Sequence, residues 1–222
     1  MSTLLVAARS IWRQATVIEV NTLKIAVGLK AHSGWAALVV IGVAGDEVQV
    51  CDRRRIELVE PGDVGWAKQP YHAAEDLPPD KARRLVDRGV NAAHRVAARE
   101  MQALVKRSRK EGHEIVGCGV LVPAPMPEWT TGQILAVHMR MHKAEGVLFP
   151  AALSRAATAC NLNLLAIPEK ELGARVEESL GISLDIGMKQ VVTLGQSVGP
   201  PWGKDQKLAT LAAMIALGEH SS

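Results

Sequence analysis

The stretch "LKIAVGLKAHSGWAALVVIGV", residues 23–43, contains two apolar runs of strand length on either side of a short polar break. Apolar side chains at consecutive positions are typical of strands that are buried on both faces of a sheet. A third strand is predicted within "DEVQVCDRRRIELVE", residues 46–60, after the turn residues Ala44, Gly45 and Asp46. Three successive strands joined by short connections favour an antiparallel meander.

The rest of the chain alternates helices with strands. After a loop rich in glycine and proline at residues 61–79, apolar residues recur at helical spacing through residues 81–112. Strands are predicted at 113–123 and 162–168, and helices at 143–161, 169–181 and 205–220, the last with Asp205 as its N-cap. A glycine-rich passage precedes the last helix. We therefore expect an α/β domain at residues 23–222, with a mixed sheet of about five strands, flanking helices and an N-terminal extension at residues 1–22.

Composition excludes some classes of protein. The formal net charge of +3 is too small to indicate nucleic-acid binding by itself. Cys51, Cys118 and Cys160 are too widely spaced for a disulfide framework or a zinc ribbon, which favours the reducing cytoplasm as the location. No segment reaches ~18 uninterrupted apolar residues, so no membrane partner is expected.

The order of elements resembles the RNase H-like fold, and in particular the RuvC-type Holliday-junction resolvases. The resemblance covers residues 23–217 and is carried by "KIAVGLKAHSGWAALVV", which is similar to the family's first hairpin, by "IVGCGVLVP" at the fourth strand and by "DQKLATLAAMIAL" in the last helix. It implies a site at the ends of the first and fourth strands and on the last helix, where carboxylates of such nucleases hold two metal ions.

Residues at the implied metal site depart from the family pattern. Lys30 stands at the first carboxylate position, and residues 117–120 of the fourth strand contain no acid. Only Asp205 remains, and a role as helix cap explains it equally well. The sequence therefore predicts an RNase H-like domain that is not an active nuclease, because a fold alone does not determine an activity.

A different site is predicted in "HMRMHKAEG", residues 138–146. If this stretch is helical, His138, His142 and Glu145 lie on one face at positions i, i+4 and i+7. Two imidazoles and a carboxylate form the ligand set of several zinc and non-heme iron sites. We expect a cleft in which His142 and Glu145 are catalytic and the ligand is bound by His32, Tyr71, His72 and His138. Any divalent metal cofactor would be held by His138, His142 and Glu145.

Three functions remain open. The leading one is a ligand-binding or degenerate-enzyme domain that uses this cleft, and the first alternative is a metal-dependent hydrolase with the same residues. The second alternative is a non-catalytic module for nucleic acid or oligomerisation, built on Arg53, Arg54, Arg55 and the basic face of the helix at 81–112. Arginine suits phosphate groups, although a solvated or salt-bridged strand face explains these arginines too. Scaffold roles such as helix capping are the competing explanation for the histidines and Glu145. The partner is then a small molecule or nucleic acid, and a homo-oligomer stays open.

Overall fold

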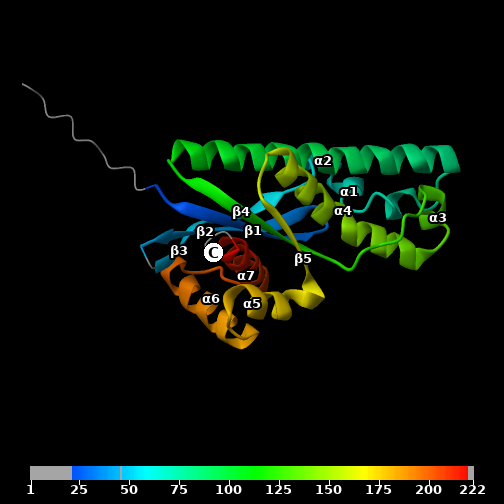
Figure 1. Ribbon diagram of the computed structural model, residues 1–222. Helices are drawn as coiled ribbons and strands as arrows, with labels where there is room; N and C mark the ends of the chain where they lie inside the picture. Colours follow the sequence, from blue (N-terminus) through cyan, green and yellow to red (C-terminus); the bar gives the residue numbers. More distant parts are fainter. Residues whose placement is uncertain (1–21, 46, 220–222) are drawn as a thin grey trace, which may run out of the picture.

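The computed structural model describes residues 22–45 and 47–219, and it contains one five-stranded sheet in the order β3-β2-β1-β4-β5 (Figure 1). β1–β2 and β2–β3 pair antiparallel, whereas β1–β4 and β4–β5 pair parallel. The predicted meander with two parallel additions in one mixed sheet is thus confirmed. The strands are β1 Lys24–His32, β2 Trp35–Ala44, β3 Glu47–Glu57, β4 Glu114–Val122 and β5 Leu164–Pro168.

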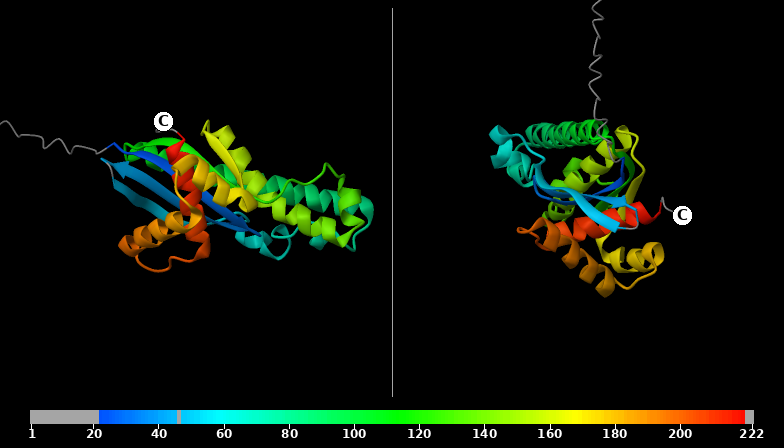
Figure 2. Two further views of the ribbon diagram at one scale, coloured as in Figure 1. Left: turned by 60° about the horizontal axis from the view of Figure 1, so that its bottom comes forward. Right: turned by 90° about the vertical axis from the view of Figure 1, so that its left-hand side faces the viewer.

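Helices cover both faces of the sheet (Figures 1 and 2). Seven α-helices are described: α1 Val64–Ala67, α2 Pro79–Lys110, α3 Thr131–Leu135, α4 His138–Ala159, α5 Leu172–Leu180, α6 Leu184–Val198 and α7 Lys204–Gly218. α2 and α4 pack on one face, where Met101, Leu104 and Phe149 are buried against the strands. α7 lies across the other face, with α5 and α6 outside it. Within the described ranges, no helix is both long and apolar enough to cross a membrane.

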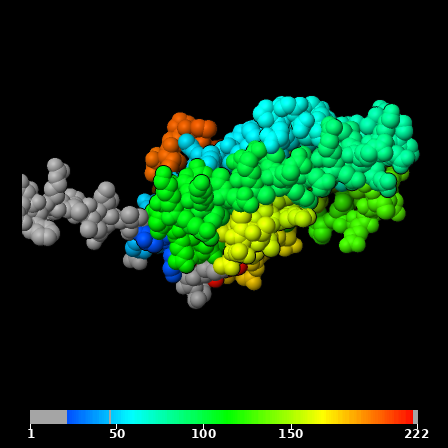
Figure 3. Space-filling model, turned by 90° about the horizontal axis from the view of Figure 1, so that it is seen from above, coloured from blue at the N-terminus to red at the C-terminus, as the bar shows by residue number. Residues whose placement is uncertain are grey.

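The long helix α2 extends past the sheet and creates the region of the candidate site. Seen from above in Figure 3, α2 runs along the surface between the cyan segment that follows β3 and the yellow C-terminal half of α4. Its N-terminal part is joined there by α3 and the first turns of α4 (Figure 1). The 3-10 helix η2, His72–Ala74, packs against the same part of α2. The loop after β3 and the start of α4 therefore meet beyond the sheet.

Small residues allow α7 to lie directly on the central strands. A Cβ atom at Gly28 of β1 would lie 1.8 Å from the carbonyl oxygen of Ala209, and one at Gly119 of β4 would lie 2.3 Å from that of Ala212. Such separations are shorter than any van der Waals contact, so both positions exclude every side chain. Glycine at these two strand positions thus allows the close approach of α7 to the sheet.

Two sequence predictions need correction in the C-terminal third. Asp205 is not the N-cap of α7, because the helix already begins at Lys204 and Gly203 is its N-cap. The backbone N–H of Gly203 donates to Gln206 Oε1 at 3.0 Å. The glycine-rich passage contains α6, to which no element was assigned. Gly195 of α6 is needed for packing, because its Cβ would lie 2.2 Å from Trp202 Cδ1. Of the predicted extension at residues 1–22, residues 1–21 lie outside the described residues.

Candidate functional site

Three histidines from two segments form a cluster at the start of α4. Helix α4 begins at His138, five residues before the predicted start at Lys143, so the stretch is helical and His138 and His142 lie one turn apart on one face. Their Nε2 atoms are 3.0 Å apart. His72, on η2, places its ring centroid 5.4 Å from that of His138 and 4.7 Å from that of His142. One nitrogen from each ring can be chosen so that all three lie within 4.8 Å of one another.

Glu145 lies beneath the cluster, and its hydrogen bonds connect α4 to the segment that contains η2. Its side chain is 4% exposed, and Oε1 accepts hydrogen bonds from the backbone N–H groups of Tyr71 at 2.8 Å and His72 at 3.2 Å. The same oxygen is 3.5 Å from His72 Nδ1. Burial raises the pKa of Glu145 to about 7, and the two backbone hydrogen bonds oppose this rise. Oε2 is buried without a hydrogen-bond partner.

The cluster is buried at one end and open at the other. The His72 side chain is 20% exposed, and both of its ring nitrogens are buried without a hydrogen bond. The His138 side chain is 59% exposed, and its Nδ1 lies 3.6 Å from Glu75 Oε1. Each of these two imidazoles therefore has one nitrogen turned towards a carboxylate. Small molecules from solvent can reach the cluster on the side of His138.

Tyr71 contributes its backbone N–H to the site, as a hydrogen-bond donor to Glu145. Its half-buried ring packs among the apolar residues that join α2 to α3 and α4. Burial raises the pKa of the Tyr71 phenol, and the negative charges of Glu145 and Asp87 add to the effect. The backbone N–H that Tyr71 donates to Glu145 helps to place His72. A ligand-binding role for the phenol stays a prediction.

The structure does not bring His32 to this cluster. His32 ends β1, where its Nε2 is 3.0 Å from Asp205 Oδ1 and its ring stacks on Trp35 with a centroid distance of 4.4 Å. Side chains alternate between the two faces of a strand. Gly28, and hence His32 four residues later, faces α7, whereas α4 lies on the opposite face. The sequence contains no signal that tells which face each helix would cover.

The end of β1 carries an ion pair. Lys30 Nζ contacts the carboxylate of Glu169, the residue that follows β5. The Lys30 side chain is 13% exposed. β4 ends at Val122 and is followed by Pro123, so no acidic side chain occurs at that strand end. A lysine ammonium therefore lies at the strand end where the resemblance implies a metal-binding carboxylate.

Arginines of β3 already have partners inside the protein. Arg53 Nη1 donates to two carbonyl oxygens of the turn at residues 199–201, both at 2.7 Å. The Arg55 guanidinium packs over Trp35, 4.0 Å from the ring centroid. Arg54 Nε lies 3.3 Å from a carboxylate of the same strand. These contacts favour a salt-bridged strand face over a strip that is free to contact phosphates.

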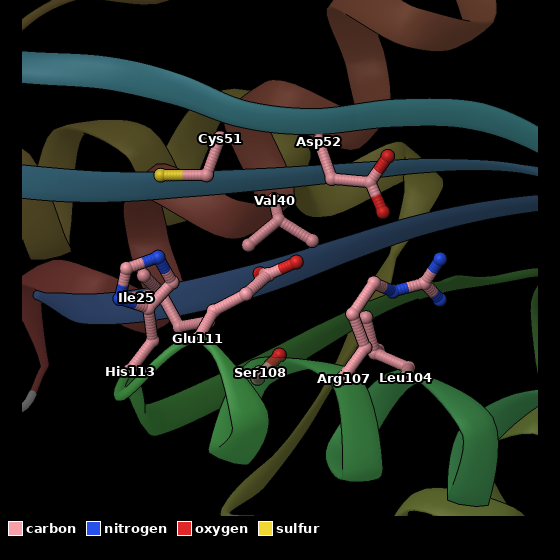
Figure 4. Close-up of a pocket in the computed structure, with 9 residues that line it drawn as sticks. All are labelled: Ile25, Val40, Cys51, Asp52, Leu104, Arg107, Ser108, Glu111 and His113. Atoms are coloured by element: carbon pink, nitrogen blue, oxygen red, sulfur yellow. The ribbon is translucent and has the colours of Figure 1, made fainter. Parts of the chain in front are cut away.

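A polar cavity, which the sequence did not indicate, lies between the C-terminal end of α2 and the strands (Figure 4). Its volume is about 150 Å³. Figure 4 shows Cys51 and Asp52 of β3 opposite the end of α2. Cys51 stands at a β-bulge, where the pairing of β2 with β3 shifts register. Burial raises the pKa of the Cys51 thiol. The cavity is lined by Ile25, Val40, Cys51, Asp52, Leu104, Arg107, Ser108, Glu111 and His113.

Comparisons with known proteins find similar structures but no similar sequence family. No family model matches the chain, and no curated protein matches it. Thermus thermophilus RuvC is 10% identical, with a TM-score of 0.48 over 86% of this chain and 92% of that one. The same protein in complex with a Holliday junction substrate is 9% identical, with a TM-score of 0.45 over 86% and 91%. An Aquifex aeolicus member of the Ppx/GppA family is 11% identical, with a TM-score of 0.35 over 72% and 41%. These identities are too low to indicate a shared activity, which has to be argued from the residues of this chain.

Proposed function

We propose that this protein is an RNase H-like domain that does not cleave nucleic acid by a two-metal mechanism and that binds a ligand in the histidine cleft, formed by His72, His138, His142 and Glu145. The observation that carries the proposal is the convergence of three imidazoles over a buried carboxylate, from two segments far apart in the sequence. Burial raises the pKa of Glu145, and carboxyl groups perturbed in this way are concentrated at functional sites.

The ion pair at the end of β1 supports the absence of two-metal chemistry. A Mg²⁺ ion needs carboxylate oxygens around it, and an ammonium group in the same place repels it. Lys30 supplies that ammonium, and its partner Glu169 is thereby neutralised. Asp205, the acid on α7, is engaged with His32.

The contacts of the cluster argue against a scaffold role for its histidines. Among the described residues, the His142 side chain hydrogen-bonds only to His138, and both rings are exposed. Within residues 22–45 and 47–219, neither ring caps a helix or binds a backbone carbonyl. Nε2 of His72 is buried without a hydrogen bond, which costs free energy in the absence of a partner. A bound ligand would provide that partner.

Thermal denaturation of the metal-free wild type and His142→Ala tests whether the cleft is a site or a scaffold. We expect the free energy of unfolding of the variant to differ from that of the wild type by less than about 0.5 kcal/mol, because an exposed side chain without structural partners contributes little to stability. A loss of about 1 to 3 kcal/mol, as for a hydrogen bond that leaves a buried partner unsatisfied, would refute the proposal.

A cleavage assay tests the nuclease half of the proposal. Branched DNA and RNA–DNA hybrids are incubated with the protein and Mg²⁺ or Mn²⁺, and we expect both substrates to remain intact. Cleavage that is abolished by Asp205→Ala would show that a nuclease centre operates at the strand ends and would overturn this half.

A further inference from the structure

We infer that the histidine cleft binds a single Zn²⁺-class ion through His72, His138 and His142, with a fourth coordination position open to solvent. This inference rests on the proposed function, because it names the ligand of the same cleft. The sequence alone predicted a different set, His138, His142 and Glu145. The contacts of Glu145 and the position of His72 change that set.

The spacing of the ring nitrogens suits a tetrahedral ion. With metal–nitrogen bonds of about 2.0–2.1 Å, two imidazole ligands of one tetrahedral ion have nitrogens about 3.3 Å apart. His138 Nε2 and His142 Nε2 are 3.0 Å apart, close to this value. All three ligand atoms lie within 4.8 Å of one another, so closure needs a movement of about 1–2 Å by His72 or its neighbours. A side-chain rotation supplies such a movement.

Two carboxylates orient the imidazoles for coordination through Nε2. Histidines that bind metal usually donate the N–H of the other ring nitrogen to a carboxylate or carbonyl, which selects the tautomer. Glu145 Oε1 faces His72 Nδ1 at 3.5 Å, and Glu75 Oε1 faces His138 Nδ1 at 3.6 Å. Both histidines thus have Nε2 available for the ion. The two carboxylates also offset the charge of a divalent cation.

Glu145 itself is not placed as a ligand. Its Oε1 already accepts two backbone hydrogen bonds from Tyr71 and His72, and the side chain is buried behind His72. His72 takes its place because the loop after β3 folds back over α4. The result is a set of three neutral nitrogen ligands, which suits Zn²⁺, Co²⁺ or Ni²⁺ and does not suit Mg²⁺ or Ca²⁺.

The fourth position distinguishes this site from a structural zinc site. Structural sites are closed by four protein ligands, whereas sites that bind substrate keep a position for water. Across residues 22–45 and 47–219, the group with metal-ligand spacing contains only His72, His138 and His142. The exposed ring of His138 leaves the cluster open on that side. Water or an oxygen atom of a small molecule would complete the coordination.

The test is a metal titration of the full chain without an affinity tag. The protein is stripped with a chelator, dialysed, and titrated with Zn²⁺ by calorimetry and with Co²⁺ by visible absorption, while Mg²⁺ serves as the negative control. We expect one equivalent of Zn²⁺ or Co²⁺ to bind and Mg²⁺ not to bind. The Co²⁺ spectrum should indicate a four- or five-coordinate ion with nitrogen ligands.

Variants assign the ligands. His72→Ala, His138→Ala and His142→Ala should each abolish stoichiometric binding, whereas Glu145→Gln and Glu75→Gln should weaken it by about 10- to 100-fold, as expected for carboxylates that orient ligands. His94→Ala, on α2 and outside the cleft, is the matched control and should bind as the wild type does. Thermal denaturation in chelator shows whether each variant is folded.

Failure of the inference can be told apart from failure of the proposed function. Absence of Zn²⁺ and Co²⁺ binding, or equal binding by the wild type and all three alanine variants, overturns the metal site. If metal-free His142→Ala nevertheless retains its stability, the cleft remains a site for another ligand. A large loss of stability in that variant overturns the cleft as a functional site altogether.

Discussion

Replacing Glu145 with alanine should detach the loop after β3 from α4. Glu145 Oε1 is the acceptor for the backbone N–H groups of Tyr71 and His72, at 2.8 and 3.2 Å. A buried donor that loses its acceptor costs about 1–3 kcal/mol, so two donors cost about 2–6 kcal/mol, less whatever water recovers. We therefore expect Glu145→Ala to lower the free energy of unfolding by about 3 kcal/mol.

Glu145→Gln is the matched comparison, because its side-chain carbonyl oxygen can still accept both hydrogen bonds. We expect this variant to lose less than about 1 kcal/mol. Urea denaturation followed by circular dichroism, in the presence of chelator, measures both variants. The reasoning is refuted if Glu145→Ala is within about 0.5 kcal/mol of the wild type, or if the glutamine variant loses as much as the alanine variant.

The pH dependence of stability gives an independent check on the same residue. Burial raises the pKa of Glu145 from 4.5 to about 7, so between these values the folded protein binds the proton more tightly than the unfolded chain does. The contribution of this carboxyl to stability is therefore greatest at low pH and falls as pH rises through that window, by at most about 3 kcal/mol. In metal-free buffer, Glu145→Gln should lack this decrease. A wild type and variant with parallel profiles would contradict the raised pKa.

Further predictions concern packing and are measured by chemical denaturation. Gly28→Ala should cost about 3 kcal/mol or prevent folding, because the new methyl group would lie 1.8 Å from the Ala209 carbonyl oxygen. Gly146→Ala is its control: apart from the adjacent residues and the nearby backbone of α4, no atom lies within 4 Å of the added Cβ, so the variant should gain about 0.5–1 kcal/mol of helix stability. Phe149→Ala should cost about 3–5 kcal/mol, because the ring is 0% exposed in the main core. Equal effects at Gly28 and Gly146 would contradict the close approach of α7.

The strands were predictable because they carry strong local signals. β1 and β2 are continuous apolar runs between turn residues, and such runs have few alternatives to a buried strand. α6 was missed because its glycines resemble those of a loop. Gly195 is accommodated in the helix because Trp202, seven residues later, packs against it. A contact of this kind depends on tertiary structure and leaves no periodic pattern.

The candidate site was predictable only in part, for a similar reason. The spacing of His138, His142 and Glu145 is a local property of one helix, and α4 places them as the spacing implies. The positions of His32 and Glu75 depend on which face of the sheet each helix covers and on how a long loop folds. The face that each helix covers and the path of the loop depend on packing across the whole molecule, so residue types and spacing do not reveal them.

The position of β1 has a consequence for synthesis on the ribosome. β1 is the central strand, and its parallel partner β4 begins only at Glu114, after the whole of α2. During translation, the nascent meander therefore has an unpaired edge along β1 until β4 has left the exit tunnel. Strands with exposed edges are templates for wrong pairing, and such long-range contacts form slowly. Chaperone binding to nascent chains that end between β3 and β4, decreasing once β4 and α7 have emerged, is the expected signature of this topology.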